Sequence, residues 1–195
     1  MNPLIKNQLI WLSGMKTLIE GQKALPGDIN FTLVQFDTVV ETVYEAVPIK
    51  DIAGVSLVPG GGTALLDAMG KTITSVGNRL SSMKERDRPD LVMIAVVTDG
   101  EENSSRFYRR EKIKEMVEHQ ASKYNWEFTL IGSNQDSFLN GQSLGFNQEA
   151  ILQYTEEKTS GAFSSLNRFA SGMACARSAG LQFAGYSEED RSASV

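Results

Sequence analysis

Cysteine and histidine are almost absent from this sequence. Its 195 residues include one cysteine, Cys175, and one histidine, His119. A single cysteine excludes an intramolecular disulfide and fits a reducing compartment. A single histidine argues against a zinc site and against catalysis by histidine. We therefore expect a protein whose chemistry depends on neither residue type.

Excess positive charge and long apolar runs are missing as well. The formal net charge is −5, so electrostatics give no reason to expect nucleic acid as the main partner. No apolar run reaches the ~20 residues that span a bilayer. The opening stretch MNPLIKNQLIWL has one lysine and lacks a small-residue cleavage pattern. We therefore expect a cytoplasmic protein that does not bind membranes.

Length and composition are those of one globular domain. The chain is 41% hydrophobic and 22% charged, which are ordinary values, and it contains neither an internal repeat nor an interdomain linker. The last residues are polar and lack an apolar stripe. We predict a single domain over residues 1–186 and a polar, flexible tail over 187–195.

Strand and helix patterns alternate along the chain. Helices are predicted where apolar residues recur three and four apart, and strands where they alternate or run together. The predicted helices cover residues 4–23, 63–76, 107–124, 135–144 and 161–178. The predicted strands cover residues 31–36, 39–47, 91–97, 127–132 and 151–154. This order predicts a three-layer, doubly wound α/β fold with a mostly parallel sheet, in which the hairpin 31–47 adds one antiparallel edge strand.

Two segments are predicted to meet at one edge of this sheet. The apolar run Leu91–Val97 ends at Asp99, and the glycines before Thr63 lead into a helix that must begin at the same rim. Ligands of such sheets bind outside the carboxyl ends of the strands. A threonine hydroxyl and an aspartate carboxylate are oxygen ligands that suit Mg²⁺ or Mn²⁺. Thr63 and Asp99 are therefore candidate metal ligands, with Gly62 and Asp67 as candidate supporting residues.

These segments resemble known motifs. GGGTAL at 60–65 and VVTDGEEN at 96–103 resemble the second and third metal-site motifs of von Willebrand factor type A domains. FTLVQFDT at 31–38 resembles the strand after that family's first helix, and FTLIGSNQDSFLNGQSLGF at 128–146 resembles small stand-alone members from bacteria and phages. The resemblance covers about residues 5–178.

The resemblance implies a function as well as a fold. In this family, a metal-ion-dependent adhesion site lies at the top of a doubly wound sheet, and an acidic side chain of a partner protein completes the metal shell. Thr63 matches the family's second-loop threonine and Asp99 its third-loop aspartate. The resemblance thus implies a protein-binding module with Mg²⁺ or Mn²⁺, and not an enzyme.

One expected motif is missing. The family's first metal loop carries Asp-x-Ser-x-Ser at the end of an opening, central strand, whereas residues 5–23 match the helix that follows this strand. One alternative interprets residues 10–15, IWLSGM, as a short strand and loop that supplies Ser13 to the metal. Otherwise, strands 31–36 and 91–97 either close onto each other or receive a strand from another chain, in a hetero- or homo-oligomer.

Simpler local roles compete with the metal site. Thr63 could be a helix N-cap, and Asp99 could belong to a strand-end turn. Glu101 and Glu102 fit the first turn of the following helix. Cys175, among small residues, is predicted to be a packed thiol. The basic residues at the start of the predicted helix 107–124 fit a solvated helix face or a phosphate-binding patch; they are Arg106, Arg109, Arg110, Lys112 and Lys114.

Three functions remain in competition. The first is an interaction module with an incomplete metal site. The second is a metal-free assembly subunit, of bacterial or phage type, that completes its sheet with a partner's strand. The third is a Mg²⁺-dependent enzyme that handles phosphate, which the sequence disfavours because it lacks G-x-x-x-x-G-K-[ST] and any histidine near the rim.

Overall fold

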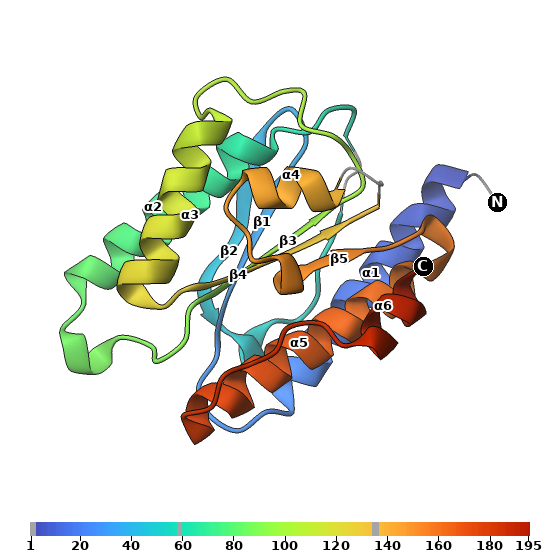
Figure 1. The fold of residues 1–195 in the computed structure, drawn as a ribbon. Helices are drawn as coiled ribbons and strands as arrows, with labels where there is room; N and C mark the ends of the chain where they lie inside the picture. The colour runs from blue at the N-terminus through green and yellow to red at the C-terminus, as the bar shows by residue number, and fades with distance from the viewer. Residues whose placement is uncertain (1–2, 58–59, 134–136) are drawn as a thin grey trace.

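The fold is mixed α/β. A computed structural model describes residues 3–57, 60–133 and 137–195 (Figure 1). The helices are α1 (Pro3–Lys23), α2 (Leu65–Ser82), α3 (Arg110–Tyr124), α4 (Ser137–Ser143), α5 (Thr159–Ala179) and α6 (Glu188–Ser194). The strands are β1 (Asn30–Phe36), β2 (Val40–Pro48), β3 (Met93–Thr98), β4 (Glu127–Gly132) and β5 (Ile151–Gln153). The element types match the sequence prediction in order; residues 135 and 136 of the fourth predicted helix lie outside the described part.

The strands form two separate sheets. β3, β4 and β5 make a parallel sheet, with Met93 opposite Glu127 and Thr98 opposite Gly132. β1 and β2 make an antiparallel hairpin whose register shifts twice, near Ala46, which has a φ of 51°. The predicted mixture of parallel strands and an antiparallel hairpin is therefore confirmed. The finer prediction, one doubly wound sheet in three layers, stays a prediction.

Helices pack on both faces of the parallel sheet. Val96 and Leu130 point toward α2 and α3 and belong to one buried cluster. Val97 and Ile131, one residue further along each strand, lie in a second cluster with side chains of α5. Figure 1 shows α2 and α3 together on one side, and α1, α5 and α6 together on the other. None of the described helices is long and apolar enough to cross a membrane.

Helix α1 is continuous, which corrects one of the sequence interpretations. The alternative of a strand and loop over residues 10–15 is wrong, and Ser13 is an exposed residue in the middle of α1. The helix is favoured over a strand and loop because its apolar residues are buried against α5. Trp11 meets the ring of Phe163 edge-on at 5.5 Å between centroids, and Gly14 lets α1 approach so closely that a Cβ there would lie 2.2 Å from that ring.

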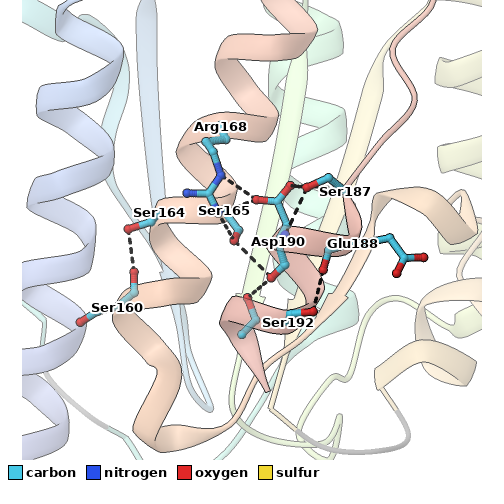
Figure 2. A network of polar contacts seen from close by, with 9 residues as sticks. Ser160, Ser164, Ser165, Arg168, Ser187, Glu188, Asp190 and Ser192 are labelled. Carbon is cyan, nitrogen blue, oxygen red and sulfur yellow. Dashed lines mark hydrogen bonds and ion pairs between the residues drawn. The ribbon is translucent and has the colours of Figure 1, made fainter.

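The C-terminal residues form a docked helix, where we expected a flexible tail. Ser187 caps α6, and the Asp190 side chain accepts a bond from the Ser187 backbone N–H in return, a capping box. The Asp190 residue is 6% exposed and its carboxylate pairs with Arg168 of α5 at 2.6 Å (Figure 2).

Cys175 on helix α5 is exposed, so the prediction of a packed thiol is wrong. The buried face of α5 includes Phe169, Ala170 and Met173 but not Cys175.

Candidate functional site

The most unusual feature of the fold is the open position between β1 and β3. These two strands belong to different sheets and do not pair with each other. Their carboxyl ends are nevertheless tied together. The Ala64 N–H donates to the carbonyl of Asp37, at the end of β1, at 2.6 Å, and the Thr63 carbonyl accepts from the N–H of Asn103, beyond β3, at 3.1 Å. The closure of β1 onto β3, one of the two alternatives from the sequence, therefore does not occur.

Both strands turn unpaired backbone groups toward this position. The carbonyls of Val92 and Thr98 accept from β4 and from Ser133 just beyond it, so by alternation the odd-numbered residues of β3 face away from β4. The Ile29 carbonyl and the Asp37 N–H bond to the β2 side of the hairpin, so at both ends of β1 the even-numbered residues face away from β2. We call the space between them the strand slot. It is bounded by Thr32, Val34, Phe36, Met93, Ala95 and Val97.

The strand slot is open along β3. Ala95 is exposed although it lies in the middle of an apolar strand and its neighbour Val96 is buried. A strand covered by helices on both faces normally has no exposed residue at its centre. Within the described residues, no backbone or side-chain group bonds to the slot-facing N–H and C=O groups. Both edges of the slot therefore run toward the same rim and carry backbone donors and acceptors that are unpaired among the described residues.

Thr63 and Asp99 lie together at the rim above the slot. Ala64 is the N-cap of α2, so the Thr63 hydroxyl does not cap the helix as the simpler interpretation had it. That hydroxyl points at the turn after β3, because a Cβ on Gly100 would lie 2.5 Å from Thr63 Oγ1. Asp99 is exposed and its carbonyl accepts from the Ser133 hydroxyl at 2.9 Å. The carboxylate of Asp99 is thus left at the surface of the rim.

Gly62 is required at the rim by close packing. A Cβ on Gly62 would lie 2.5 Å from Ser104 Oγ and 2.6 Å from Thr38 Cγ2. At Gly60, a Cβ would lie 2.0 Å from a carboxylate oxygen of Asp37. Asp37 at the end of β1 is therefore a rim carboxylate that the sequence interpretation missed. Its position directly after a predicted strand was the available signal.

Asp67, the second candidate supporting residue, holds a loop next to the rim. Its carboxylate accepts three backbone N–H groups, from Arg106 at 2.8 Å, Phe107 at 2.9 Å and Tyr108 at 2.8 Å. The residue is 4% exposed. Burial alone would raise the pKa of Asp67, but these three bonds and the nearby Lys71 ammonium lower it below the ordinary value.

Glu102 serves a helix other than the one expected. α3 begins only at Arg110, so Glu102 is not in its first turn. Instead, the Glu102 carboxylate accepts from the N–H of Leu66 in α2 at 2.9 Å and from the N–H of Ser105 at 2.8 Å. Glu102 therefore lies at a helix N-terminus, as predicted from the preference of carboxylates for such positions, but the helix is α2 and not α3.

A small cavity lies behind Asp99, between the sheet and helices α1 and α5. It is lined by Trp11, Asp99, Tyr154, Glu156 and Thr159, among others. The Tyr154 residue is 1% exposed, and its hydroxyl makes no hydrogen bond of ordinary geometry within the described part of the chain, although the Ser133 side chain lies near it. Burial raises the pKa of Tyr154, and the Asp99 carboxylate raises it further. Asp99 is therefore close enough to act electrostatically on the core as well as on the rim.

Thr63 and Asp99 remain candidate metal ligands. Within residues 3–57, 60–133 and 137–195, no three His, Cys, Asp or Glu side chains converge to hold an ion. Thr63 and Asp99 offer hard oxygen ligands of the kind that Mg²⁺ prefers, but Mg²⁺ demands a nearly complete octahedron. Two such donors would occupy only part of that shell.

Comparisons with known proteins leave the family of this chain open. No family model matches the sequence, and no curated protein matches it. A solved structure that is similar is proximal thread matrix protein 1 from the mussel byssus, with a TM-score of 0.59 and 14% sequence identity. The match covers 85% of this chain and 42% of the mussel chain, so this chain spans less than half the length of that protein. At this identity, the similarity concerns the fold alone.

Proposed function

We propose that this chain is a protein-interaction module, resembling von Willebrand factor type A domains, whose sheet is completed by a strand from another chain. The observation that carries the proposal is the strand slot between β1 and β3. Two edges with the same direction and with unpaired backbone groups face one space. Strand addition to an open edge is a common mode of peptide recognition, and here both sides of the incoming strand would find partners.

The slot constrains the strand that it accepts. β1 and β3 both end at the rim, so a strand parallel to both pairs on each side. Side chains on its two faces would meet apolar clusters, that of Phe36 and Ile94 on one face and that of Met93 and Val97 on the other. We therefore expect an apolar strand of about six residues, the mean length of strands in sheets. Each backbone hydrogen bond adds roughly 1 kcal/mol and apolar burial adds more.

The proposal also accounts for the incomplete metal site. A parallel strand in the slot delivers its carboxyl end, and the loop after it, beside Thr63 and Asp99. Oxygen ligands on that loop, or an acidic side chain of the partner, would complete the shell of Mg²⁺ or Mn²⁺. The chain alone should therefore bind these ions weakly, and the assembled module should bind them more tightly.

Amide hydrogen exchange tests the slot directly. In a chain that is monomeric by light scattering, the amides of Met93, Ala95 and Val97 should exchange far faster than those of Ile94 and Val96, whose N–H groups face β4. Equal protection of odd- and even-numbered amides in the monomer would show that the slot is closed, and the proposal would fail. Protection that rises with protein concentration, together with a doubled mass, would identify the donated strand as that of a second copy.

Proline substitution provides a matched pair of variants. Ala95→Pro removes an N–H that faces the slot, so the isolated chain should lose only about 1–2 kcal/mol of stability while strand binding is blocked. Val96→Pro removes an N–H that faces β4 and should cost about 3 kcal/mol or more. Equal losses of stability in chemical denaturation would contradict the assignment of the slot edge.

A metal-free assembly subunit is the second candidate, and the same slot supports it. Calorimetric titration with Mg²⁺, with and without the bound strand, separates the two. Binding that strengthens on assembly and disappears in Asp99→Ala supports the shared metal site. If Mg²⁺ binds to neither state at millimolar concentrations, the metal part is excluded and the assembly role remains.

A further inference from the structure

A single aromatic side chain stands out on the surface between β3 and α3. Phe107 is 77% exposed, more than any other large apolar side chain in the described ranges. It lies in the loop that connects the rim to α3, which begins at Arg110. Exposed single apolar residues are common, so exposure alone assigns no role. The way in which the loop is held and the charges around it carry the argument.

The loop that carries Phe107 is fixed from inside. The Asp67 carboxylate accepts the N–H of Phe107 itself at 2.9 Å, together with those of the residues on either side. The next side chain, Tyr108, points inward and packs so closely that a Cβ on Gly70 would lie 2.3 Å from its ring. With its backbone held on both sides, Phe107 cannot turn into the core. The structure therefore holds the backbone of this loop in place and directs the Phe107 side chain to solvent.

Positively charged residues lie near the ring in space or in sequence. The Lys71 ammonium lies 5.7 Å from the centroid of the Phe107 ring. Arg106 and Arg109 are exposed, and neither has an ion pair among the described residues. Further along α3, by contrast, Lys112 and Lys114 pair with Glu115 and Glu118 at 3.2 and 3.7 Å. The basic cluster noted in the sequence thus divides. Lys112 and Lys114 are paired on α3, Arg110 donates to the Ser143 hydroxyl, and Arg106 and Arg109 flank Phe107 without an ion pair in the described ranges.

We propose that Phe107, Lys71, Arg106 and Arg109, together the Phe107 patch, bind an acidic protein segment that encloses the Phe107 ring in an apolar pocket. Aromatic and arginine side chains are the residues most enriched at the centres of protein interfaces. A rigid anchor binds without the entropy cost of ordering a loop. The charge is complementary to an acidic partner and is local, since the whole chain carries −5.

An acidic protein fits the Phe107 patch better than nucleic acid does. Single-stranded nucleic acid is bound by grooves in which several aromatic rings stack on successive bases along a basic track. Here one ring stands alone, and the net charge of the chain repels a long polyanion. The Phe107 patch is independent of the strand slot, so the two proposals can fail separately.

Selection from a display library of random dodecapeptides tests the proposal with the full chain as bait. We expect enrichment of acidic peptides that contain an apolar residue. Their binding should weaken about tenfold or more in Phe107→Ala and in the double variant Arg106→Glu, Arg109→Glu. Leu181→Ala is the control, because Leu181 is 69% exposed, far along the chain from the patch, and should leave binding unchanged.

The outcomes separate the alternatives. Enriched peptides without an acidic bias, or peptides that bind Phe107→Ala as tightly as the wild type, would overturn the proposal. Peptides that lose binding only in Ala95→Pro belong to the strand slot and would also count against the Phe107 patch. A fluorescein-labelled oligothymidine that binds the patch more tightly than the selected peptides would assign it to nucleic acid instead.

Discussion

Replacing Asp67 by asparagine should destabilise the protein by about 3 kcal/mol at neutral pH. The carboxylate accepts three backbone N–H groups inside the protein, where water cannot replace it. In Asp67→Asn, an amide oxygen can still accept from Phe107 and Tyr108, but the amide nitrogen then faces the N–H of Arg106. A lost bond to a charged group costs roughly 1.5–3 kcal/mol, and the two remaining bonds lose their charge assistance.

The pH dependence of this effect has a defined sign. The pKa of Asp67 is lowered in the folded state, so the stability from its carboxylate is complete above the unfolded value of about 3.9. It disappears as the pH falls through the folded-state pKa, because protonated aspartic acid then resembles asparagine. The difference between wild type and Asp67→Asn should therefore be constant from about pH 5 to 8 and shrink below about pH 4.

Urea unfolding followed by circular dichroism measures this difference. Asp51→Asn is the matched control, since Asp51 is an exposed carboxylate and its substitution should change stability by less than about 0.5 kcal/mol. A loss below about 1 kcal/mol in Asp67→Asn, or a loss that persists unchanged in acid, would refute the assigned role. Because the same bonds fix the Phe107 loop, Asp67→Asn should also raise the exchange rate of the Phe107 amide.

Two further predictions concern the packing of α6 and the core. Asp190→Asn should release α6 from α5 and lower stability by about 2 kcal/mol, because the buried Asp190 carboxylate binds Arg168 and Ser187. The pKa of Asp190 is lowered in the folded protein, so this contribution to stability should also vanish below about pH 4. Unchanged resistance of α6 to trypsin would contradict the prediction. Tyr154→Phe should leave thermal stability unchanged or raise it, because the buried hydroxyl makes no hydrogen bond of ordinary geometry in the described ranges; a loss above about 1 kcal/mol would reveal a hydrogen bond.

The element order could be predicted because it depends on local patterns. The apolar run 91–97 became β3, and the spacing of three and four in residues 4–23 became α1. Residues 127–132 form β4 with the predicted bounds. These patterns persist in the fold because each element buries the face that its own sequence makes apolar.

The candidate site was predictable in position but not in its contacts. The apolar run before Asp99 and the glycines before Thr63 placed both residues at one rim, which the fold brings together. The roles of Asp67 and Glu102 were not predictable, since each carboxylate serves backbone groups nearly forty residues away in sequence. The docking of α6 likewise depended on bonds to distant residues, among them the ion pair of Asp190 with Arg168 and the bond from Arg191 to the Ile151 carbonyl.

The sequence by itself determined the strands and helices from α1 to α5, though not α6, and which oxygen-bearing residues lie at the ends of the strands. Only the tertiary structure decided that β1 and β3 remain apart with their edges open, that α1 is helical throughout, and that Phe107 is held outward. The physical reason is the range of the interactions. Periodic burial is encoded within each segment, whereas strand pairing and buried hydrogen bonds join residues that meet only after the chain has folded.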